Sequence, residues 1–586
     1  MRRLLLVLLA LAITAGGCWI APNAGSAFDD VVAEVWAFEL AEDPLFATAV
    51  GENSHNHRLP SVTLGDEARR ADARRGFLAR LESIDAGLLG EPARTSHAML
   101  VRQLRDRVAE YEFGCHFIPI TADDGFHIAF AGLPGGMPFR AVRDFENYLA
   151  RLRVFPAYVG QEIAVMREGL RGGWSMPRIV LEGYAVTMTS HLVEDPEQSL
   201  FWAPFREFPP AVPEADRERL RTEARRAIAD AVVPAYRALH EFMVGEYVPA
   251  ARTTLGASEL PNGRTYYAHR VRMFTTLDIT PEQVHQTGLD EVARIRAEME
   301  QVIRETGFSG DFAAFLQFLR TDPRFYAKTP EALLERAAWI AKRMDGKLPS
   351  LFGRLPRLPY GVAPVPAHLA PKYTAGRYVP AAPGGTQAGT YWVNTFALES
   401  RPLYALEALT LHEAVPGHHF QYALAHELEE VPPFRRFAEM NAFSEGWGLY
   451  SERLGLEAGF YTDPYSNFGR LKYEMWRACR LVVDTGIHFM GWTREQVMEF
   501  LAANTALSLH EVRTETDRYI SWPGQALAYK MGELKIRELR ARAEQRLGER
   551  FDLRAFHDEL LRHGPVPLDV LESQIDAWIG TRASRP

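Results

Sequence analysis

The segment HEAVPGHH, residues 412–419, constrains this chain more than any other. It is an interrupted form of the HExxH pattern, in which two histidines four residues apart on one helical face bind Zn²⁺ and the glutamate activates a water molecule. Here Pro416 occupies the fourth position after His412, and His418 and His419 follow six and seven residues on. In a regular helix position i+6 lies about 120° from the first face, and i+7 lies about 10.5 Å along the axis. The segment can therefore chelate one ion only if the helix breaks or bulges, and its proline and glycine favour such an irregularity.

Two further carboxylates belong to the candidate site. Glu413 directly follows the first histidine, so we expect it to act as general base toward a metal-activated water. Glu445 lies 27 residues after His418, in NAFSEGWGLYSERLG, which suits a second helix that brings a carboxylate to the metal. Glu452, seven residues further on, shares its helical face and is the competing ligand.

The same segments resemble a known family. HEAVPGHH is followed by Gln421 and by FSEGW at residues 443–447, with Tyr450 and Glu452 after it. This combination resembles the bacterial domain-of-unknown-function family 885, whose members look like distant relatives of the thimet-type oligopeptidases. The segments PLFATAVG, EGLRGGWSMP, RACRLVVDTGIH and RYISWPGQALAYKMG extend the resemblance over nearly all of the chain after its N-terminus.

The resemblance implies a zinc-dependent peptidase with one Zn²⁺ per chain. Matching the Gly-His of this chain to the Gly-His that ends HExGH in the thimet-type relatives makes His418 the second ligand, with His419 as the alternative. The family pattern favours Glu445 as the third ligand. The implied fold is mainly α: a two-lobed, zincin-like metallopeptidase with a small β element beside the active-site groove.

Related zinc peptidases also imply residues that contact the substrate. They bring a tyrosine from a distant helix to the oxyanion, and Tyr529 is the first candidate for this role, with Tyr519 the second. Arg518 could hold a substrate carboxylate. Tyr391 lies in the β-like run GTYWVN, where an edge strand would pair with the substrate backbone. His419, if it does not bind the metal, would contact substrate.

The organisation of the chain is that of a helical protein. Long segments rich in Ala, Leu, Glu and Arg predict helices at residues 66–89, 145–170, 213–244, 280–306, 330–344, 465–490 and 525–547. Residues 356–394 are instead dense in Pro, Gly, Tyr and Val. We expect a helical N-terminal half at residues 25–265 and a catalytic half at residues 266–586, packed as one body.

The N-terminus predicts export. A basic start, a short apolar run and AGGC before Trp19 are typical of a signal peptide, residues 1–18, with a lipoprotein site at Cys18. The protein would then be a membrane-anchored lipoprotein or a periplasmic or extracellular protein. A net charge of −9 argues against nucleic acid as a partner. Cys115 and Cys479 could form one bridge or remain two thiols.

We therefore expect an exported zinc peptidase that acts on short or unfolded peptides. Two alternatives stay open: a zinc hydrolase of a non-peptide amide or ester, and a lipoprotein that binds peptides on the same scaffold without turnover. The sequence does not indicate an oligomeric state. Because no GxSxG elbow and no CxxC pair occur in the chain, serine and redox chemistries are disfavoured.

Overall fold

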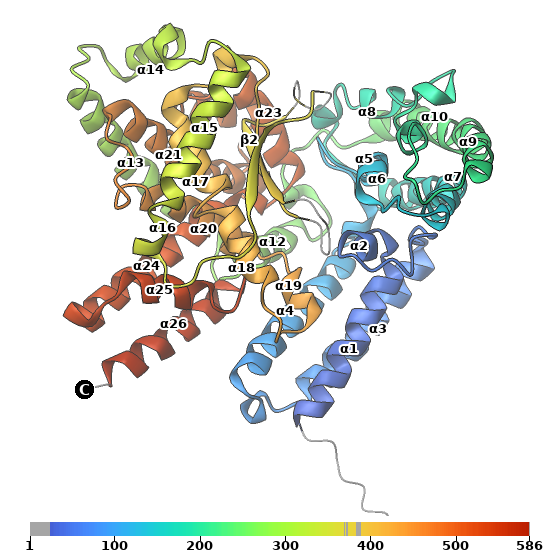
Figure 1. Cartoon of the computed structure of the whole chain (residues 1–586), viewed down its shortest axis with the longest axis horizontal. Coiled ribbons are helices and arrows are strands. Elements are labelled where there is room, and N and C mark those ends of the chain that lie inside the picture. Colours follow the sequence, from blue (N-terminus) through green and yellow to red (C-terminus); the bar gives the residue numbers. More distant parts are fainter. Residues whose placement is uncertain (1–23, 368–369, 371–372, 382–387, 585–586) are drawn as a thin grey trace, which may run out of the picture.

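The computed structural model describes residues 24–367, 370, 373–381 and 388–584, so the predicted signal peptide and Cys18 lie outside the described residues. The fold is mainly helical with one small sheet, which confirms the predicted fold class at that level (Figure 1). Within the described ranges, no helix has the length and apolar character needed to cross a membrane. Cys115 and Cys479 are both free thiols.

The N-terminal helices are drawn from blue to green in Figure 1. They are α1 (Ala24–Glu42), α2 (Pro44–Ala49), α3 (Leu64–Glu82), α4 (Glu91–Glu112), α5 (Phe126–Ala131), α6 (Leu133–Gly136), α7 (Val142–Arg171), α8 (Val186–Thr189), α9 (Glu214–Ala227), α10 (Val233–Phe242) and α11 (Val248–Ala250). The helix predicted at residues 213–244 is interrupted by wider π turns at Ile228–Val232 and Met243–Tyr247. Each π turn is followed by a proline, Pro234 or Pro249, which cannot donate a helical hydrogen bond.

The C-terminal helices surround the HEAVPGHH segment. They are α12 (Gly263–Thr275), α13 (Pro281–Glu305), α14 (Phe312–Thr321), α15 (Pro330–Asp345), α16 (Leu348–Leu351), α17 (Leu406–Glu413), α18 (His418–His426), α19 (Pro433–Arg436), α20 (Asn441–Leu454), α21 (Pro464–His488), α22 (Arg494–Asn504), α23 (Leu509–Ser521), α24 (Ala528–Leu547), α25 (Leu553–Leu561) and α26 (Leu568–Ala583). Four of them, α13, α15, α21 and α24, follow the predicted ranges closely.

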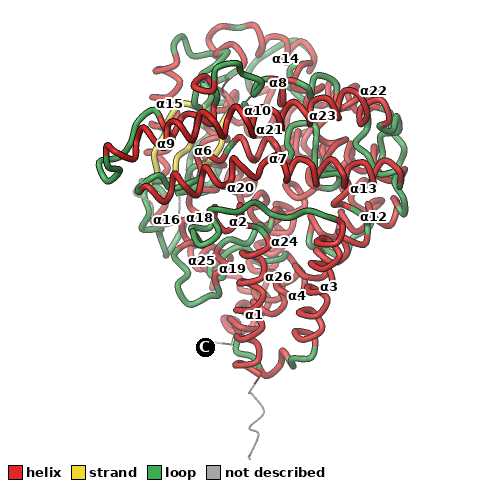
Figure 2. Tube along the Cα trace, turned by 90° about the vertical axis from the view of Figure 1, so that its right-hand side faces the viewer, coloured by secondary structure: helices red, strands yellow, loops and turns green. Residues whose placement is uncertain are grey.

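The two halves of the chain share one hydrophobic core. Its buried residues run from Phe28 in α1 to Ile579 in α26. Figure 1 shows α5 to α10 on one side of the molecule and the C-terminal helices on the other, and Figure 2 shows α1, α3 and α4 gathered with α26 at one end. Polar contacts also join distant segments, since Arg435 donates to Ser96 Oγ at 3.0 Å. The predicted boundary at residues 265/266 falls inside α12, which packs against α20 and α24.

The sheet lies beside α17. It contains β1 (Tyr360–Pro364), β2 (Gly376–Val379) and β3 (Gly389–Val393) in the order β1-β3-β2, with β1 parallel and β2 antiparallel to β3. The strand predicted near residues 389–394 is therefore present. It is the central strand, however, and the edge that contacts α17 is β2.

Two glycines bring the helices behind the site into backbone contact. A Cβ added at Gly446 of α20 would lie 2.5 Å from Gly532 Cα of α24, and one added at Gly532 would lie 1.9 Å from the Ala442 carbonyl oxygen. Because any side chain would force α20 and α24 apart, these glycines set the depth at which α20 sits. Glu445 is the neighbour of Gly446, so this crossing also positions its carboxylate.

Helix α24 is tied to two other helices by a buried lysine. Lys530 is fully buried, and its ammonium lies 2.9 Å from Glu291 in α13, 2.9 Å from Glu474 in α21 and 2.8 Å from Glu533. Burial alone would lower the pKa of Lys530, but the three carboxylates raise it above its usual range. The charge is therefore permanent and neutralised inside the protein.

Replacing this lysine should destabilise the fold. Lys530→Met leaves three carboxylates without their shared cation, and removing one partner from a buried ionic cluster costs about 3–5 kcal/mol. The free energy of unfolding from denaturant titration measures the loss. Lys535 lies on the same helix, and its partners are the more exposed Glu538 of α24 and Glu572 of α26. Lys535→Met should therefore change the free energy of unfolding by less than about 1 kcal/mol. Equal effects of both substitutions would contradict this assignment.

Candidate metal centre

The helix that carries HEAVPGHH breaks at the predicted place. Helix α17 ends at Glu413 and α18 begins at His418, with non-helical ψ angles of −104° at Ala414 and −127° at Gly417. The intervening loop is closed by backbone hydrogen bonds, from Gly417 N to Leu411 O at 3.0 Å and from His419 N to Ala414 O at 3.1 Å. The two extra residues are thus absorbed in a compact loop between two short helices.

Glycine is required at position 417 by a close backbone approach. A Cβ added there would lie 1.9 Å from the carbonyl oxygen of His412. The loop is held from outside as well, because Trp447 Nε1 of α20 donates to the Pro416 carbonyl oxygen at 2.7 Å. The path of the chain between the two histidines is therefore defined by local sterics and by its contact with α20.

The break brings together His412, His418 and Glu445. One ligand atom from each lies within 4.8 Å of the others. Glu445 Oε2 is 3.5 Å from His412 Nε2 and 3.6 Å from His418 Nε2, and the oxygen has no hydrogen-bond partner among the described residues. Two ligands held at about 2.0–2.1 Å by a tetrahedral ion are about 3.3–3.4 Å apart. The donor set and its spacing therefore fit a zinc-sized ion.

The local electrostatics favour a positive charge at this point. Burial lowers the pKa of His412, but Glu445 and Glu452 outweigh burial and raise it to about 9. Burial likewise raises the pKa of Glu445, but the imidazoles of His412 and His418 bring it well below its usual range. The cluster therefore stabilises either a proton or a metal cation between these side chains.

The orientation of the His412 imidazole is fixed from two sides. Glu452 Oε1 lies 2.8 Å from His412 Nδ1, which leaves Nε2 facing Glu445. A Cβ at Gly448 would lie 2.7 Å from His412 Cε1, so the absence of a side chain there makes room for the ring. Glu452 itself lies 3.6 Å from Arg477 Nη2. Glu452, the alternative ligand in the sequence, is placed behind the histidine and not in the three-residue cluster.

Glu413 lies at the edge of the sheet. Its Oε2 accepts a hydrogen bond of 2.8 Å from the backbone N–H of Tyr378 in β2. Arg377, an exposed residue of the same strand, is within electrostatic range of both Glu413 and Tyr529. The edge strand thus orients the candidate general base through the Tyr378 N–H. Nothing in the sequence indicated the contact with Tyr378.

His419 faces away from the cluster. Its Nδ1 lies 3.0 Å from the Tyr378 hydroxyl, and its ring lies 4.5 Å from the Tyr360 ring. Burial lowers the pKa of His419 to about 4, so the ring is neutral. The ring of His419 therefore faces β1 and β2, and His419 contributes no ligand atom to the cluster that contains His418.

The predicted substrate contacts differ in accessibility. Tyr391 is fully buried, with its hydroxyl 3.4 Å from Thr410 Oγ1 of α17. Its strand has neighbours on both sides, so its backbone is not free to pair with a substrate. Tyr519 is also buried, and its hydroxyl accepts from Trp476 Nε1 and Arg480 Nε, both at 2.9 Å. Neither side chain is open to a ligand in this arrangement.

Tyr529 and Arg518 lie together. Arg518 interacts with the Tyr529 hydroxyl, donates to Gln525 Oε1 at 2.8 Å and lies 3.4 Å from Glu515. The Arg480 guanidinium lies 4.4 Å from the centre of the Tyr529 ring. Tyr529 is half-buried, in contrast to Tyr391 and Tyr519, whereas Arg518 already has a carboxylate partner in the protein.

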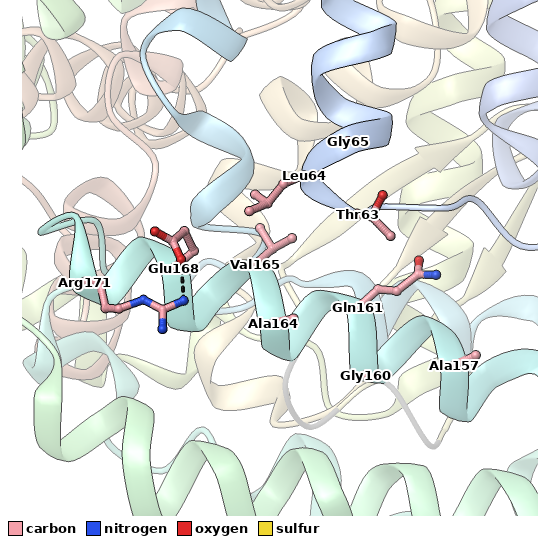
Figure 3. Close-up of a pocket in the computed structure, with 10 residues that line it drawn as sticks. All are labelled: Thr63, Leu64, Gly65, Ala157, Gly160, Gln161, Ala164, Val165, Glu168 and Arg171. Carbon is pink, nitrogen blue, oxygen red and sulfur yellow. Dashed lines mark hydrogen bonds and ion pairs between the residues drawn. The ribbon is translucent and has the colours of Figure 1, made fainter.

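A separate cavity of about 580 Å³ lies in the N-terminal half (Figure 3). It is lined by the start of α3, at Thr63 to Gly65, and by one face of α7 from Ala157 to Arg171. Glu168 and Arg171 form an ion pair with each other at its rim. None of the lining residues is a histidine or belongs to the cluster, so this cavity is unrelated to the candidate metal centre.

The loop can be tested with one methyl group. Gly417→Ala should destabilise the protein by about 3 kcal/mol, because the new Cβ cannot coexist with the His412 carbonyl oxygen. Denaturant titration measures the change. Gly580→Ala on α26, where the Cβ meets nothing within 4 Å, should be neutral or stabilise by up to about 1 kcal/mol. An alanine tolerated at both positions would show that the loop is formed differently.

Comparisons with known proteins support the fold. The chain aligns over 96% of its length with all of a crystal structure from Colwellia psychrerythraea, with 28% identity and a TM-score of 0.90. A second structure, from Shewanella oneidensis, has 18% identity and a TM-score of 0.71, over 94% of this chain and 99% of that one. Both are described as a "putative lipoprotein", the second of unknown function.

The family assignment comes from the sequence model of one protein family. No curated protein matches the chain. The model for bacterial proteins of unknown function DUF885 matches residues 44–575, which include the histidine cluster and every helix from α2 to α25. The chain therefore belongs to the DUF885 family of bacterial proteins.

Proposed function

We propose that this protein is a zinc-dependent peptidase. The observation that carries the proposal is the placement of His412, His418 and Glu445 at tetrahedral ligand spacing, with the carboxylate of Glu413 on the adjoining residue. Three protein ligands leave a fourth position for water, as in hydrolytic zinc sites. A bound zinc ion would supply Lewis acidity, which lowers the pKa of that water and polarises a carbonyl group.

Glu413 acts as the general base in this proposal. It takes a proton from the water that attacks the scissile carbonyl, and it returns a proton to the amine that leaves. The N–H of Tyr378 holds one carboxylate oxygen at 2.8 Å and so directs the other toward the reaction. Tyr529 donates from its hydroxyl to the carbonyl oxygen as negative charge develops there.

The edge strand favours a peptide over a small amide or ester. In the described part of the sheet, β2 pairs with β3 on one side and has no strand on the other. Its backbone meets Glu413, so an extended peptide bound along this edge would place its carbonyl groups near the general base. The zincin-like fold and the distant relationship to thimet-type oligopeptidases belong to the same proposal.

Export as a lipoprotein also remains a proposal for this chain. The pattern at residues 1–18 supports it, and so does the description of the two similar structures. Lipid on Cys18 would hold the enzyme at a membrane surface, where it would meet peptides outside the cytoplasm.

Substitution of Glu413 gives the direct test of the chemistry. Glu413→Gln retains an oxygen to accept from Tyr378 and leaves the three ligands in place, so zinc content should not change. Loss of the general base should lower kcat on a short-peptide mixture by about 10²- to 10⁴-fold, measured by mass spectrometry. Glu429→Gln, an exposed glutamate after α18, is the matched control. Hydrolysis that survives in Glu413→Gln, or that resists a zinc chelator, would contradict the proposal.

A further inference from the structure

Two cationic side chains of α21, Arg477 and Lys472, both lie beside the ring of Tyr473. Arg477 Nη2 lies 3.6 Å from Glu452, which in turn contacts His412 Nδ1 at 2.8 Å. The Arg477 guanidinium lies 4.7 Å from the centre of the Tyr473 ring, and the Lys472 ammonium lies 5.8 Å from the same centre. A short chain of contacts therefore links Lys472 to the first metal ligand.

Lys472 has no carboxylate partner among the residues that the structure describes. Its side chain is 8% exposed, and its neighbours are the rings of Tyr404 and Tyr473. In the part of the chain that the structure describes, its ammonium forms no hydrogen bond and no ion pair. Burial lowers the pKa of Lys472, and the positive charges of Arg401 and Arg477 act in the same direction. An isolated buried ammonium is unfavourable unless an anion joins it.

Arg401, which follows β3 in the chain, is a second cation without an ion-pair partner among the described residues. Its Nε is buried without a partner, and its guanidinium makes no ion pair with a described residue. Glu511 acts electrostatically on both Arg401 and Lys472 but lies outside ion-pair distance of either. Its carboxylate instead caps α23 through the Ser508 N–H at 2.8 Å. The two cations thus share one distant carboxylate.

Other buried cations in the described part of the fold have ion-pair or hydrogen-bond partners. Arg151 and Arg435, which lack a carboxylate partner there, donate to backbone carbonyl oxygens. Lys530 has three carboxylates within 2.9 Å, and Arg480 and Arg518 each lie 3.4 Å from Glu515. The net charge of the chain is −9, so carboxylates are not scarce. The unpaired charges of Lys472 and Arg401 therefore mark a place where the missing anion comes from a ligand.

We propose that Arg401 and Lys472 bind a carboxylate of the substrate, namely the free carboxylate at the C-terminus of a peptide. This inference rests on the proposed peptidase function and makes the enzyme one that cleaves close to the C-terminus. Arg401 and Lys472 supply charge without an internal partner, and Arg477 connects the subsite to the metal ligand through Glu452. Arg518, the residue expected from the sequence to take this role, already pairs with Glu515.

Calorimetric binding to the Glu413→Gln protein tests the subsite without turnover. The probes are trialanine with a free C-terminus, trialanine amide, and an acetylated, amidated Ala-Glu-Ala peptide. The free acid should bind at least about tenfold more tightly than the amide, as expected for a charged hydrogen-bonded contact. Adding Lys472→Met or Arg401→Gln should remove most of this difference, whereas adding Lys535→Met should leave it unchanged.

A fold control accompanies the binding assay. Because Lys472 has no carboxylate partner, Lys472→Met should leave the melting temperature unchanged or raise it, in contrast to Lys530→Met. Weaker binding of the free acid by this stable variant therefore reports lost ligand contact and not lost structure.

Three results would overturn the inference. These are equal binding of acid and amide, a preference for the acid that survives both Lys472→Met and Arg401→Gln, and binding of the glutamate peptide as tight as that of the free acid. The last result would assign the subsite to a side-chain carboxylate. Failure of the proposed function gives a different outcome. In that case the wild-type protein hydrolyses none of the peptides, but the Glu413→Gln protein still binds the free acid more tightly than the amide.

Discussion

The site depends on one backbone irregularity, the break between Glu413 and His418. A continuous helix would hold the two histidines on different faces or too far apart for one ion. The break is stabilised by a steric condition, the contact of Gly417 with the His412 carbonyl, and by the hydrogen bond from Trp447 to Pro416. Insertion of two residues into the HExxH spacing is therefore compatible with chelation.

Helix α20 supplies the residues that surround the His412 imidazole. Its residues Glu445, Gly448 and Glu452, spaced three and four apart, lie on one face and serve the same imidazole. The first faces Nε2, the second leaves space for the ring, and the third contacts Nδ1. The backbone contact of α20 with α24, and the buried ion pairs of Lys530 in α24, hold this face of α20 in position beside the loop.

The sequence was informative where the chemistry is local. The break between the histidines could be predicted from their spacing and from the properties of proline and glycine. The choice of His418 over His419, and of Glu445 over Glu452, depended on the family resemblance. Contacts made through tertiary structure could not be predicted. The strand containing Tyr391 became central because β1 and β2, hidden in a Pro- and Gly-rich stretch, pair on both sides of it. The unpaired state of Lys472 likewise depends on which carboxylates the fold leaves out of reach.

The central claim is that the broken helix gives His418, and not its neighbour His419, to a metal ion. Elemental analysis of purified protein tests it most directly, on wild type beside His418→Ala and His419→Ala, with chelator-free buffers throughout. The account predicts about one zinc per chain in wild type and in His419→Ala, and none in His418→Ala. Zinc retained in His418→Ala but lost in His419→Ala, or a wild-type protein that takes up no zinc, would contradict it.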